Sequence, residues 1–323
     1  MTTGADLDQA LAEEAAVIAT RAVPGFVPAA ARPYGRVRRR SAAYQVTDGA
    51  GVSLAVKRER DGAAAVEQHV YRVVLPAAGL AAVHCHGVGP SREPGWSWLV
   101  TDHVEGAAFD PRDAAHTAGL GSWLGALHAR TSGLPELAAV PRHGAAHWRA
   151  LLEGAAGVLD GAIANPAVGA GAMAAITTLR AAFGAVVEGW AEIGALLDRA
   201  PASLVHGDLS HRNVKVVGPA GDLRPMVLDW ETAGHGPAAV DLVWADLAAY
   251  EDAVAPAGPH LDGSSLRRLQ TLGTLAWTAY VLHGERANLA SPWPHRAAGK
   301  VASYLDLVDD DGVADLLRAR VEP

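Results

Sequence analysis

The chain has few of the residues that would cross-link it or carry it to a membrane. Cys85 is its one cysteine among 323 residues, which excludes an internal disulfide framework and fits a reducing compartment. The first residues are acidic and lack the basic start of a secretory leader. The strongest apolar run, near residues 162–176, is interrupted by an Asn-Pro pair and two glycines. We therefore expect a cytoplasmic protein with no membrane partner.

Clusters of positive charge are also scarce. Lys and Arg number 27 against 35 Asp and Glu, which gives a net charge of −8. Phosphate backbones bind clustered Lys and Arg, so nucleic acid is excluded as the main partner. The arginine-rich run at residues 36–40 is the local exception. An acidic balance favours a cationic small partner, although it also serves solubility.

What the sequence does contain is a change of texture near residue 106. Before it, the spacing of apolar residues predicts two helices and four strands, over residues 6–22, 43–46, 52–57, 63–75, 81–88 and 96–103. Pro76 is expected to end the second helix. Beyond it, helical spacing dominates and two short strands interrupt it, over residues 114–199, 214–217, 227–230, 266–280 and 301–308. This order predicts an α+β protein with three segments, a lead-in at 1–33, a small β-rich lobe at 34–105 and a large, mostly helical lobe at 106–323.

The most informative side chains lie on and beside the two short strands. Asp208 lies in a His-Gly-Asp sequence, Asn213 follows five residues later where a strand begins, and Asp229 ends the next strand. A strand, a turn and a return strand would place Asn213 and Asp229 at the same end of a hairpin. Carboxylate and carboxamide oxygens suit Mg²⁺, and an Asp beside it can orient a hydroxyl during phosphoryl transfer. The pattern indicates a phosphotransferase.

These residues also carry a family resemblance. The sequence His-Gly-Asp-Leu-Ser-His-Arg-Asn, then Leu-Asp-Trp-Glu, Gly-Pro and Asp-Leu, resembles the aminoglycoside phosphotransferase and choline kinase family. The resemblance extends from about residue 34 to 280 and is strongest over 205–244. It implies a two-lobed protein-kinase-like fold, with a small β-rich N-lobe and a large helical C-lobe. It also implies ATP and Mg²⁺ as cofactors and a hydroxyl of a small molecule as acceptor.

The resemblance assigns a role to each matching position. Asp208 resembles the family's catalytic Asp, and Asn213 and Asp229 resemble its Mg²⁺ ligands. Asp241 resembles an acid that braces the catalytic loop from inside the lobe. His206 is expected to orient this loop by hydrogen bonding rather than to transfer the proton itself.

A nucleotide site in the small lobe needs a lysine for the phosphates and an acid that holds this lysine. Lys57 ends a predicted strand, and Glu67 lies in the helix that follows. The spacing of Glu67 and Tyr71 resembles the paired helix of the family. We therefore predict a Lys57–Glu67 ion pair, and we expect Glu59 to lie too close along the chain to reach the lysine.

The phosphate loop departs from the kinase pattern, because no Gly-x-Gly-x-x-Gly sequence is present. Residues 35–44 occupy its place, and backbone amides near Ser41 can contact phosphate there. A solvated basic turn is an equally good interpretation of this stretch. The base of the nucleotide is expected at the connector between lobes, on backbone groups of Asp102, His103 and Val104, which leaves ATP or GTP open.

The acceptor is expected in the large lobe. Ser210 and Arg212 on the catalytic loop are candidates for contacting it, although Arg212 can equally pair with a neighbouring acid. Five aromatic side chains are candidates for the pocket wall, though each alone is more often a core residue: Trp244, Trp277, Tyr280, His283 and Trp293.

Several functions are compatible with these residues. The leading hypothesis is a kinase that phosphorylates an antibiotic or related natural product, in resistance or self-protection. A kinase of a primary metabolite such as choline, homoserine or a sugar is the alternative within the same chemistry. A metal-dependent hydrolase using His206, Asp208, His211 and Asp229, and a non-catalytic nucleotide-binding regulator, are alternatives of other classes. The sequence indicates neither the acceptor nor the oligomeric state.

Overall fold

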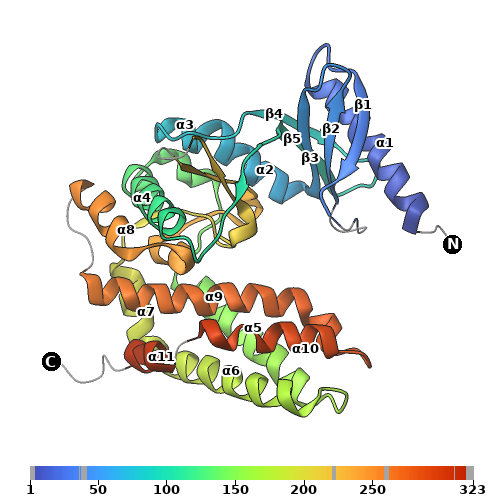
Figure 1. The fold of residues 1–323 in the computed structure, drawn as a ribbon. Coiled ribbons are helices and arrows are strands. Elements are labelled where there is room, and N and C mark those ends of the chain that lie inside the picture. Colours follow the sequence, from blue (N-terminus) through green and yellow to red (C-terminus); the bar gives the residue numbers. More distant parts are fainter. Residues whose placement is uncertain are drawn as a thin grey trace. The chain divides into compact units, whose positions relative to one another are not determined.

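The computed structural model confirms an α+β architecture (Figure 1). It describes residues 4–35, 37, 42–219, 223–257, 262–308 and 310–317. The chain forms two compact units, a first unit of residues 1–109 and 212–233 and a second unit of residues 110–211 and 234–323. The first boundary lies close to the predicted residue 105, but the hairpin within 212–233 belongs to the first unit. The division into functional lobes remains a prediction.

The first unit is built on a five-stranded antiparallel sheet with the order β1-β2-β3-β5-β4. Its strands are β1 (Pro28–Pro33), β2 (Ala42–Asp48), β3 (Ser53–Arg60), β4 (Cys85–Pro90) and β5 (Trp96–Asp102). The turn between β2 and β3 depends on Asp48, whose carboxylate accepts the amides of Ala50 and Val52. Strand β4 begins at Cys85, later than the predicted residue 81, and its pairing with β5 shifts register between Cys85 and Gly87.

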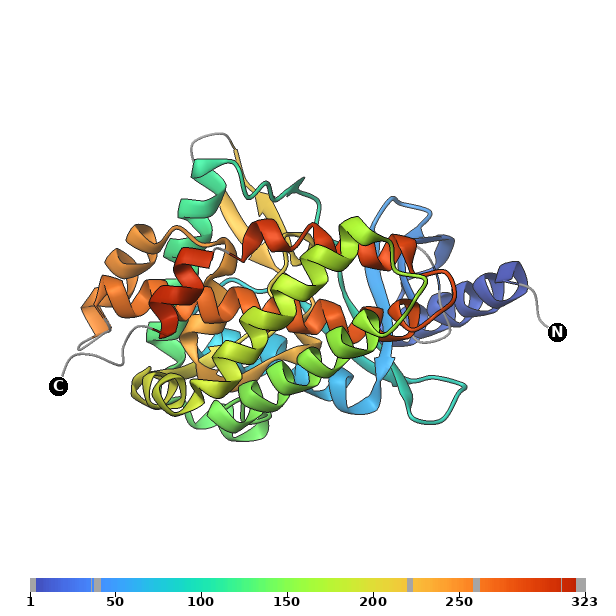
Figure 2. The same cartoon turned by 90° about the horizontal axis from the view of Figure 1, so that it is seen from below.

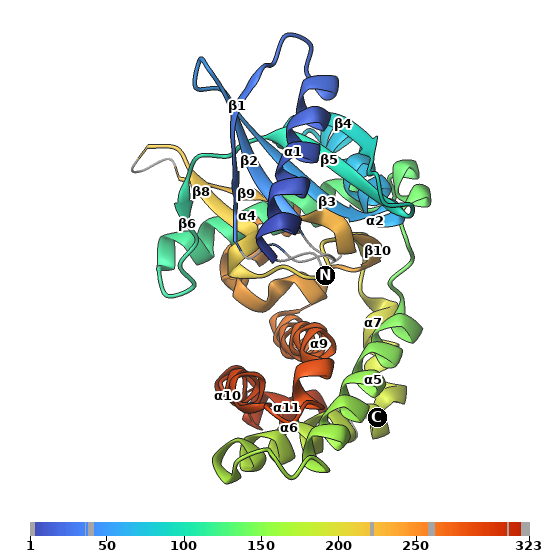
Figure 3. The same cartoon turned by 90° about the vertical axis from the view of Figure 1, so that its right-hand side faces the viewer.

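Helices cover both faces of this sheet. Helix α1 (Gly4–Ala22) crosses one face (Figure 3). Helix α2 (Asp61–His69), a π-helical turn η1 (Val70–Val74) and α3 (Leu75–Ala77) form a continuous segment that packs on β3, β4 and β5. Alternate side chains of β3 therefore lie on opposite faces of the sheet. Leu54 and Val56 pack in the core under α1, whereas Lys57 contacts Glu67 of α2. The prediction that the helix ends at residue 75, before Pro76, is wrong by two residues, because α3 continues through Pro76 to Ala77. A missing amide near a helix end costs little.

A small sheet completes the first unit. It has the order β6-β8-β9 and consists of β6 (Ala107–Ala108), β8 (Val214–Val217) and β9 (Arg224–Val227). Val214 of β8 pairs with Val227 of β9 in an antiparallel register. The predicted hairpin is therefore present, but its second strand covers Arg224–Val227 and not the predicted 227–230, because the chain turns into a short helical segment at Trp230–Thr232. The turn of the hairpin includes residues outside the described part of the chain.

The second unit is mostly helical. Its helices are α4 (Ala114–Thr131), α5 (Ala145–Ile163), α6 (Ala170–Glu188), α7 (Trp190–Arg199), α8 (Leu247–Val254), α9 (Gly263–Leu289), α10 (His295–Ala302) and α11 (Asp310–Leu317). Figure 2 shows α5 and α6 alongside α9 and α10, and α5–α6, α5–α9 and α6–α10 are in contact. Strands β7 (Ala202–Val205) and β10 (Gly234–Pro237) form an antiparallel pair. The predicted helix over 301–308 is wrong, because α10 starts directly after Pro294 and ends at Ala302.

Helix α6 is long and apolar enough to cross a membrane, with a mean hydropathy of 1.5 over its most apolar 18 residues. The sequence did not indicate an apolar helix of this length, because the Asn-Pro pair and the two glycines of the run at 162–176 lie around the start of α6. Its buried residues lie along one face, as in an amphipathic helix that packs this face on its neighbours: Ala175, Ile176, Leu179, Phe183 and Val186. One helix of this length and composition is weak evidence for a membrane span. The absence of a membrane partner remains a prediction.

Glycines let α4 and α8 approach closely. A Cβ atom added at Gly125 would lie 2.6 Å from the Cβ of Ala253 and 2.7 Å from the carbonyl oxygen of Tyr250. We expect Gly125→Ala to lower the free energy of unfolding by about 1–3 kcal/mol, because this contact has no room. Gly157→Ala in α5 is the matched control, since nothing lies within 4 Å of its added Cβ, and it should stabilise by about 0.5–1 kcal/mol. Urea denaturation measures both, and a neutral or stabilising Gly125→Ala would contradict the close packing.

Candidate nucleotide and metal site and catalytic loop

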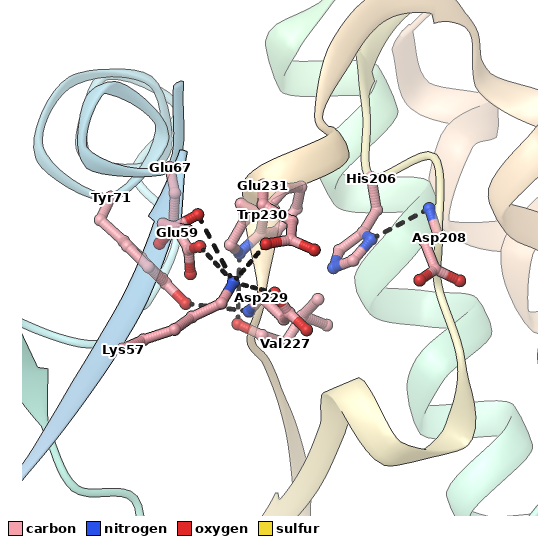
Figure 4. Close-up of polar contacts among 10 residues, drawn as sticks. All are labelled: Lys57, Glu59, Glu67, Tyr71, His206, Asp208, Val227, Asp229, Trp230 and Glu231. Atoms are coloured by element: carbon pink, nitrogen blue, oxygen red, sulfur yellow. Dashed lines mark hydrogen bonds and ion pairs between the residues drawn. The ribbon is translucent and has the colours of Figure 1, made fainter. Parts of the chain in front are cut away.

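Lys57 lies within a cluster of four acidic side chains in the first unit (Figure 4). Its Nζ atom donates to Glu67 Oε2 at 3.0 Å and to the carboxylate of Asp229. Glu231 Oε2 lies 3.1 Å from the same nitrogen and Glu59 Oε2 lies 3.6 Å from it. The structure thus contains the ion pair expected between Lys57 and Glu67.

Two members of the cluster were missed by sequence reasoning. The expectation that Glu59 cannot reach Lys57 is wrong, because residues i and i+2 of a strand share one face. Glu231 follows Asp229 by two residues, and the short helical turn η4 (Trp230–Thr232) returns its carboxylate to the lysine. The alternation along β3 was the available signal for Glu59, whereas nothing in the sequence indicated the path of η4.

The pKa values of Lys57, Glu59 and Glu67 are all raised in this cluster, which holds more carboxylates than cations. Burial alone would lower the pKa of Lys57, but the carboxylates of Glu67 and Asp229 outweigh burial and raise this pKa well above its usual value. Burial, followed by the nearby charge of Glu67, raises the pKa of Glu59 to about 9, although Lys57 opposes the shift. Burial also raises the pKa of Glu67. The lysine therefore stays charged in surroundings that have more acid than one cation can balance.

Asn213 and Asp229 lie at the same end of the β8–β9 hairpin, as predicted. The amide of Leu228 donates to the carbonyl oxygen of Asn213 at 2.8 Å. Among the described residues, Asp229 is the only non-glycine residue with a positive φ, at 69°. This left-handed conformation is unfavourable for most residues but accessible to Asp, and here the Asp229 amide donates to the hydroxyl oxygen of Tyr71. Its side chain remains 37% exposed.

These two side chains fit Mg²⁺ by the chemistry of their donors. Mg²⁺ prefers hard oxygen ligands, and it is commonly held by one or two carboxylates together with substrate phosphates rather than by an all-protein cage. Consistently, the described residues contain no group of three or more His, Cys, Asp or Glu side chains arranged to hold a metal.

The catalytic loop belongs to the second unit, where β7 leads into His206, Gly207 and Asp208. Gly207 has a φ of +84°, which a glycine adopts without steric cost. The Asp208 amide donates to Nδ1 of the buried His206 at 3.4 Å (Figure 4), and the Ser210 amide donates to the Asp208 carbonyl at 2.9 Å. Backbone contacts thus hold the loop, while the Asp208 side chain is half-buried.

Asp241 lies fully buried behind this loop. Its two carboxylate oxygens accept the amide of His206 at 2.6 Å and the amide of Gly207 at 3.0 Å. His128 Nε2 lies 3.7 Å from one of these oxygens, and His128 Nδ1 is 3.1 Å from the hydroxyl of Tyr250. These are the contacts expected of an acid that braces the loop.

A cavity of about 550 Å³ opens in the second unit beside the catalytic loop. His211 and Trp244, whose rings meet edge to face, line it together with Arg112, Thr117 and Asp246. Of the predicted aromatic residues, Trp244 lines this cavity, and binding of an acceptor there remains a prediction. Tyr280 does not line this cavity; burial, and then the nearby charge of Asp208, raise its pKa to about 12.

The remaining aromatic candidates lie elsewhere. Trp277 is buried against Trp244 and Tyr304, as a core residue. Trp293 is 81% exposed and does not line this cavity. His283 contacts α5, with Nε2 3.2 Å from the carbonyl oxygen of Leu151. None of these three lines this cavity, and their part in an acceptor pocket remains a prediction.

Some backbone groups of the connector residues predicted to contact the base already form hydrogen bonds within the protein. The amides of Asp102 and His103 donate to the carbonyl oxygens of His84 and Ser53. The Asp102 carbonyl accepts the Thr101 hydroxyl at 3.2 Å, so of the three predicted residues the Val104 amide and the carbonyls of His103 and Val104 are left to bind a base edge. Base binding there remains a prediction.

Three further predicted residues have roles that no contact establishes. Ser41 and the arginines of the 36–40 run lie outside the described residues. Ser210 is half-buried and Arg212 is exposed within the turn η3 (His211–Asn213). Contacts of Ser210 and Arg212 with an acceptor therefore remain predictions.

Solved structures with the same fold cover nearly the whole chain. A spectinomycin phosphotransferase in complex with ADP and spectinomycin is 14% identical, with a TM-score of 0.63 over 96% of this chain and 97% of that one. An aminoglycoside phosphotransferase bound to GDP and kanamycin is 16% identical, with a TM-score of 0.62 over 93% and 98%. A microcompartment-associated aminopropanol kinase is 16% identical, with a TM-score of 0.60 over 94% and 99%. These likenesses confirm the kinase-like fold.

The sequence itself shows the family. No curated protein matches it. The profile of the phosphotransferase enzyme family matches residues 36–280, which include Lys57, Glu67, Asp208, Asn213 and Asp229. The chain therefore belongs to the phosphotransferase enzyme family.

Proposed function

We propose that the protein transfers the terminal phosphoryl group of ATP or GTP to a hydroxyl of a small molecule. The observation that carries this proposal is the Lys57–Glu67 ion pair in the same unit as Asn213 and Asp229. A lysine held by an acid is the group that kinases use for the donor's phosphates. Asn213 and Asp229 would hold Mg²⁺, which neutralises phosphate charge when bound.

Asp208 is the group we assign to the acceptor. Its carboxylate orients the attacking hydroxyl and takes its proton late in the transfer. His206 serves as a positioning residue, because it is buried and its Nδ1 accepts the Asp208 amide. Asp241 positions the same loop through two backbone amides.

We propose an antibiotic or related natural product as the acceptor, modified in the cytoplasm for resistance or self-protection. The likeness to phosphotransferases bound to spectinomycin and kanamycin supports this choice. The net charge of −8 and the presence of Asp246 and Trp244 in the cavity favour a cationic acceptor. A kinase of a small amino alcohol is the second candidate, supported by the likeness to an aminopropanol kinase.

An acceptor screen separates these candidates. The protein is incubated with Mg²⁺, ATP or GTP, and two panels, one of aminocyclitol and aminoglycoside antibiotics and one of amino alcohols, homoserine and sugars. We expect one antibiotic class to gain a phosphoryl group by mass spectrometry, with matching release of nucleoside diphosphate. Product only from the second panel would support the metabolite kinase. Nucleotide binding with no product from either panel would favour a regulator, and hydrolysis that needs a bound transition metal but no nucleotide would favour a hydrolase.

A further inference from the structure

The proposed metal ligand Asp229 already binds a cation of the protein itself. Its carboxylate accepts a hydrogen bond from Lys57 Nζ, and Glu231 lies 3.1 Å from the same nitrogen (Figure 4). Lys57 therefore contacts the side chain expected to hold Mg²⁺, in addition to its contact with Glu67 on α2. The ammonium group occupies the negative field that would attract a metal.

Glu59 is a buried acid beside Lys57 that receives no hydrogen bond from the described residues. Glu59 is 3% exposed, and within the described part of the chain neither of its carboxylate oxygens has a hydrogen-bond partner. The Lys57 ammonium lies 3.6 Å from it, beyond hydrogen-bonding distance. Buried polar groups are seldom left without a partner. A small displacement of the Lys57 ammonium group away from Asp229 and toward Glu59 would give Glu59 a hydrogen-bond partner. Glu67 would keep its hydrogen bond to the same ammonium group.

We propose that Lys57 is the resident cation of this cluster in the nucleotide-free protein, and that a divalent cation binds Asp229 only by displacing it. This inference rests on the proposed function, which assigns Asp229 to the metal. Two cations sharing one carboxylate repel each other, so the metal and Lys57 compete. Glu59 and Glu67 receive the displaced ammonium, which explains why this chain places a second buried acid beside its lysine. Metal without nucleotide should consequently bind weakly.

Mn²⁺ binding measured by electron paramagnetic resonance, with no nucleotide present, tests the competition. We expect Lys57→Met to bind Mn²⁺ about tenfold more tightly than the wild type, within the range of coupling between sites in proteins. Lys300→Met is the matched control, because it removes the same charge from an ion pair with Glu285 in the second unit. It should leave Mn²⁺ affinity unchanged. Equal affinity of Lys57→Met and the wild type would overturn the proposal.

The wild type gives a second readout that does not depend on how the variant folds. The chain has three lysines, Lys57, Lys215 and Lys300, so the NMR signals of its lysine side chains can be assigned one by one. On addition of Mg²⁺ alone, the Lys57 signal should shift at the concentrations at which metal binds, while the Lys300 signal stays in place. A Lys57 signal that does not move as Mg²⁺ binds would show that no displacement occurs.

One further variant separates this inference from the function on which it rests. Adding Asp229→Asn to Lys57→Met should abolish the gain in Mn²⁺ affinity. If the double variant keeps that affinity, Asp229 is not the ligand and the proposed metal site is wrong. If instead the wild type binds Mn²⁺ as tightly as Lys57→Met, and Asp229→Asn alone removes this binding, the metal site stands and only the displacement of Lys57 is overturned.

Discussion

Asp208→Asn should lower kcat by about 100- to 10,000-fold, the usual contribution of a positioned acid or base. Asparagine has nearly the same shape as aspartate but cannot take the proton of the attacking hydroxyl. The two backbone contacts of the loop should survive, because the amide and the carbonyl of Asp208 make them. Nucleotide affinity should therefore change little. Release of nucleoside diphosphate, with an acceptor from the screen at saturation, measures kcat, and calorimetric titration measures nucleotide binding.

Asp160→Asn is the control for this experiment. Asp160 is an exposed residue of α5 paired with Arg180, so the same chemical change should leave kcat within about twofold, as surface substitutions have small effects. Retention of kcat by Asp208→Asn would show that another group takes the proton. A loss of nucleotide affinity equal to the loss of kcat would instead assign Asp208 to the donor site.

Local sequence patterns were enough to predict which residues of the first unit form the proposed nucleotide and metal site. The distance along the chain from Asn213 to Asp229 matched a strand, a turn and a return strand, and the register of Val214 with Val227 confirms it. The Lys57–Glu67 pair was predictable because a strand and the helix after it are neighbours in sequence. Consecutive elements that are joined by short connections usually lie side by side, so contacts between them can be predicted from the sequence.

Features that depend on distant packing were not predictable. Glu231 reaches Lys57 through the turn η4, which the left-handed backbone of Asp229 precedes, and no residue pattern specifies this conformation for a residue other than glycine. Whether an aromatic ring lines a pocket or a core depends on which helices meet. This is why Trp244 lines the cavity, whereas Trp277 is buried and Trp293 is exposed.

Asp241→Asn should affect both stability and catalysis, although Asp241 lies behind the loop that bears Asp208. Its two oxygens accept two backbone amides in a fully buried site. An asparagine side chain has one acceptor oxygen, so its NH₂ group would face one amide and leave it without a partner. An unsatisfied buried donor costs about 1–3 kcal/mol, and loss of a buried charged partner costs more. We expect the free energy of unfolding to fall by about 2–4 kcal/mol on the same basis.

Positioning by Asp241 can be separated from a general loss of stability. Urea denaturation gives the free energy of unfolding, and amide hydrogen exchange reports on His206 and Gly207 directly, the two residues whose amides Asp241 accepts. In the folded variant, these two amides should exchange faster while amides of α9 keep their protection relative to global unfolding. The kcat should fall at saturating nucleotide, because a loop that has lost a backbone contact holds Asp208 less firmly. If stability falls but kcat and the exchange of the two amides do not change, Asp241 is a core residue of the second unit and does not brace the catalytic loop.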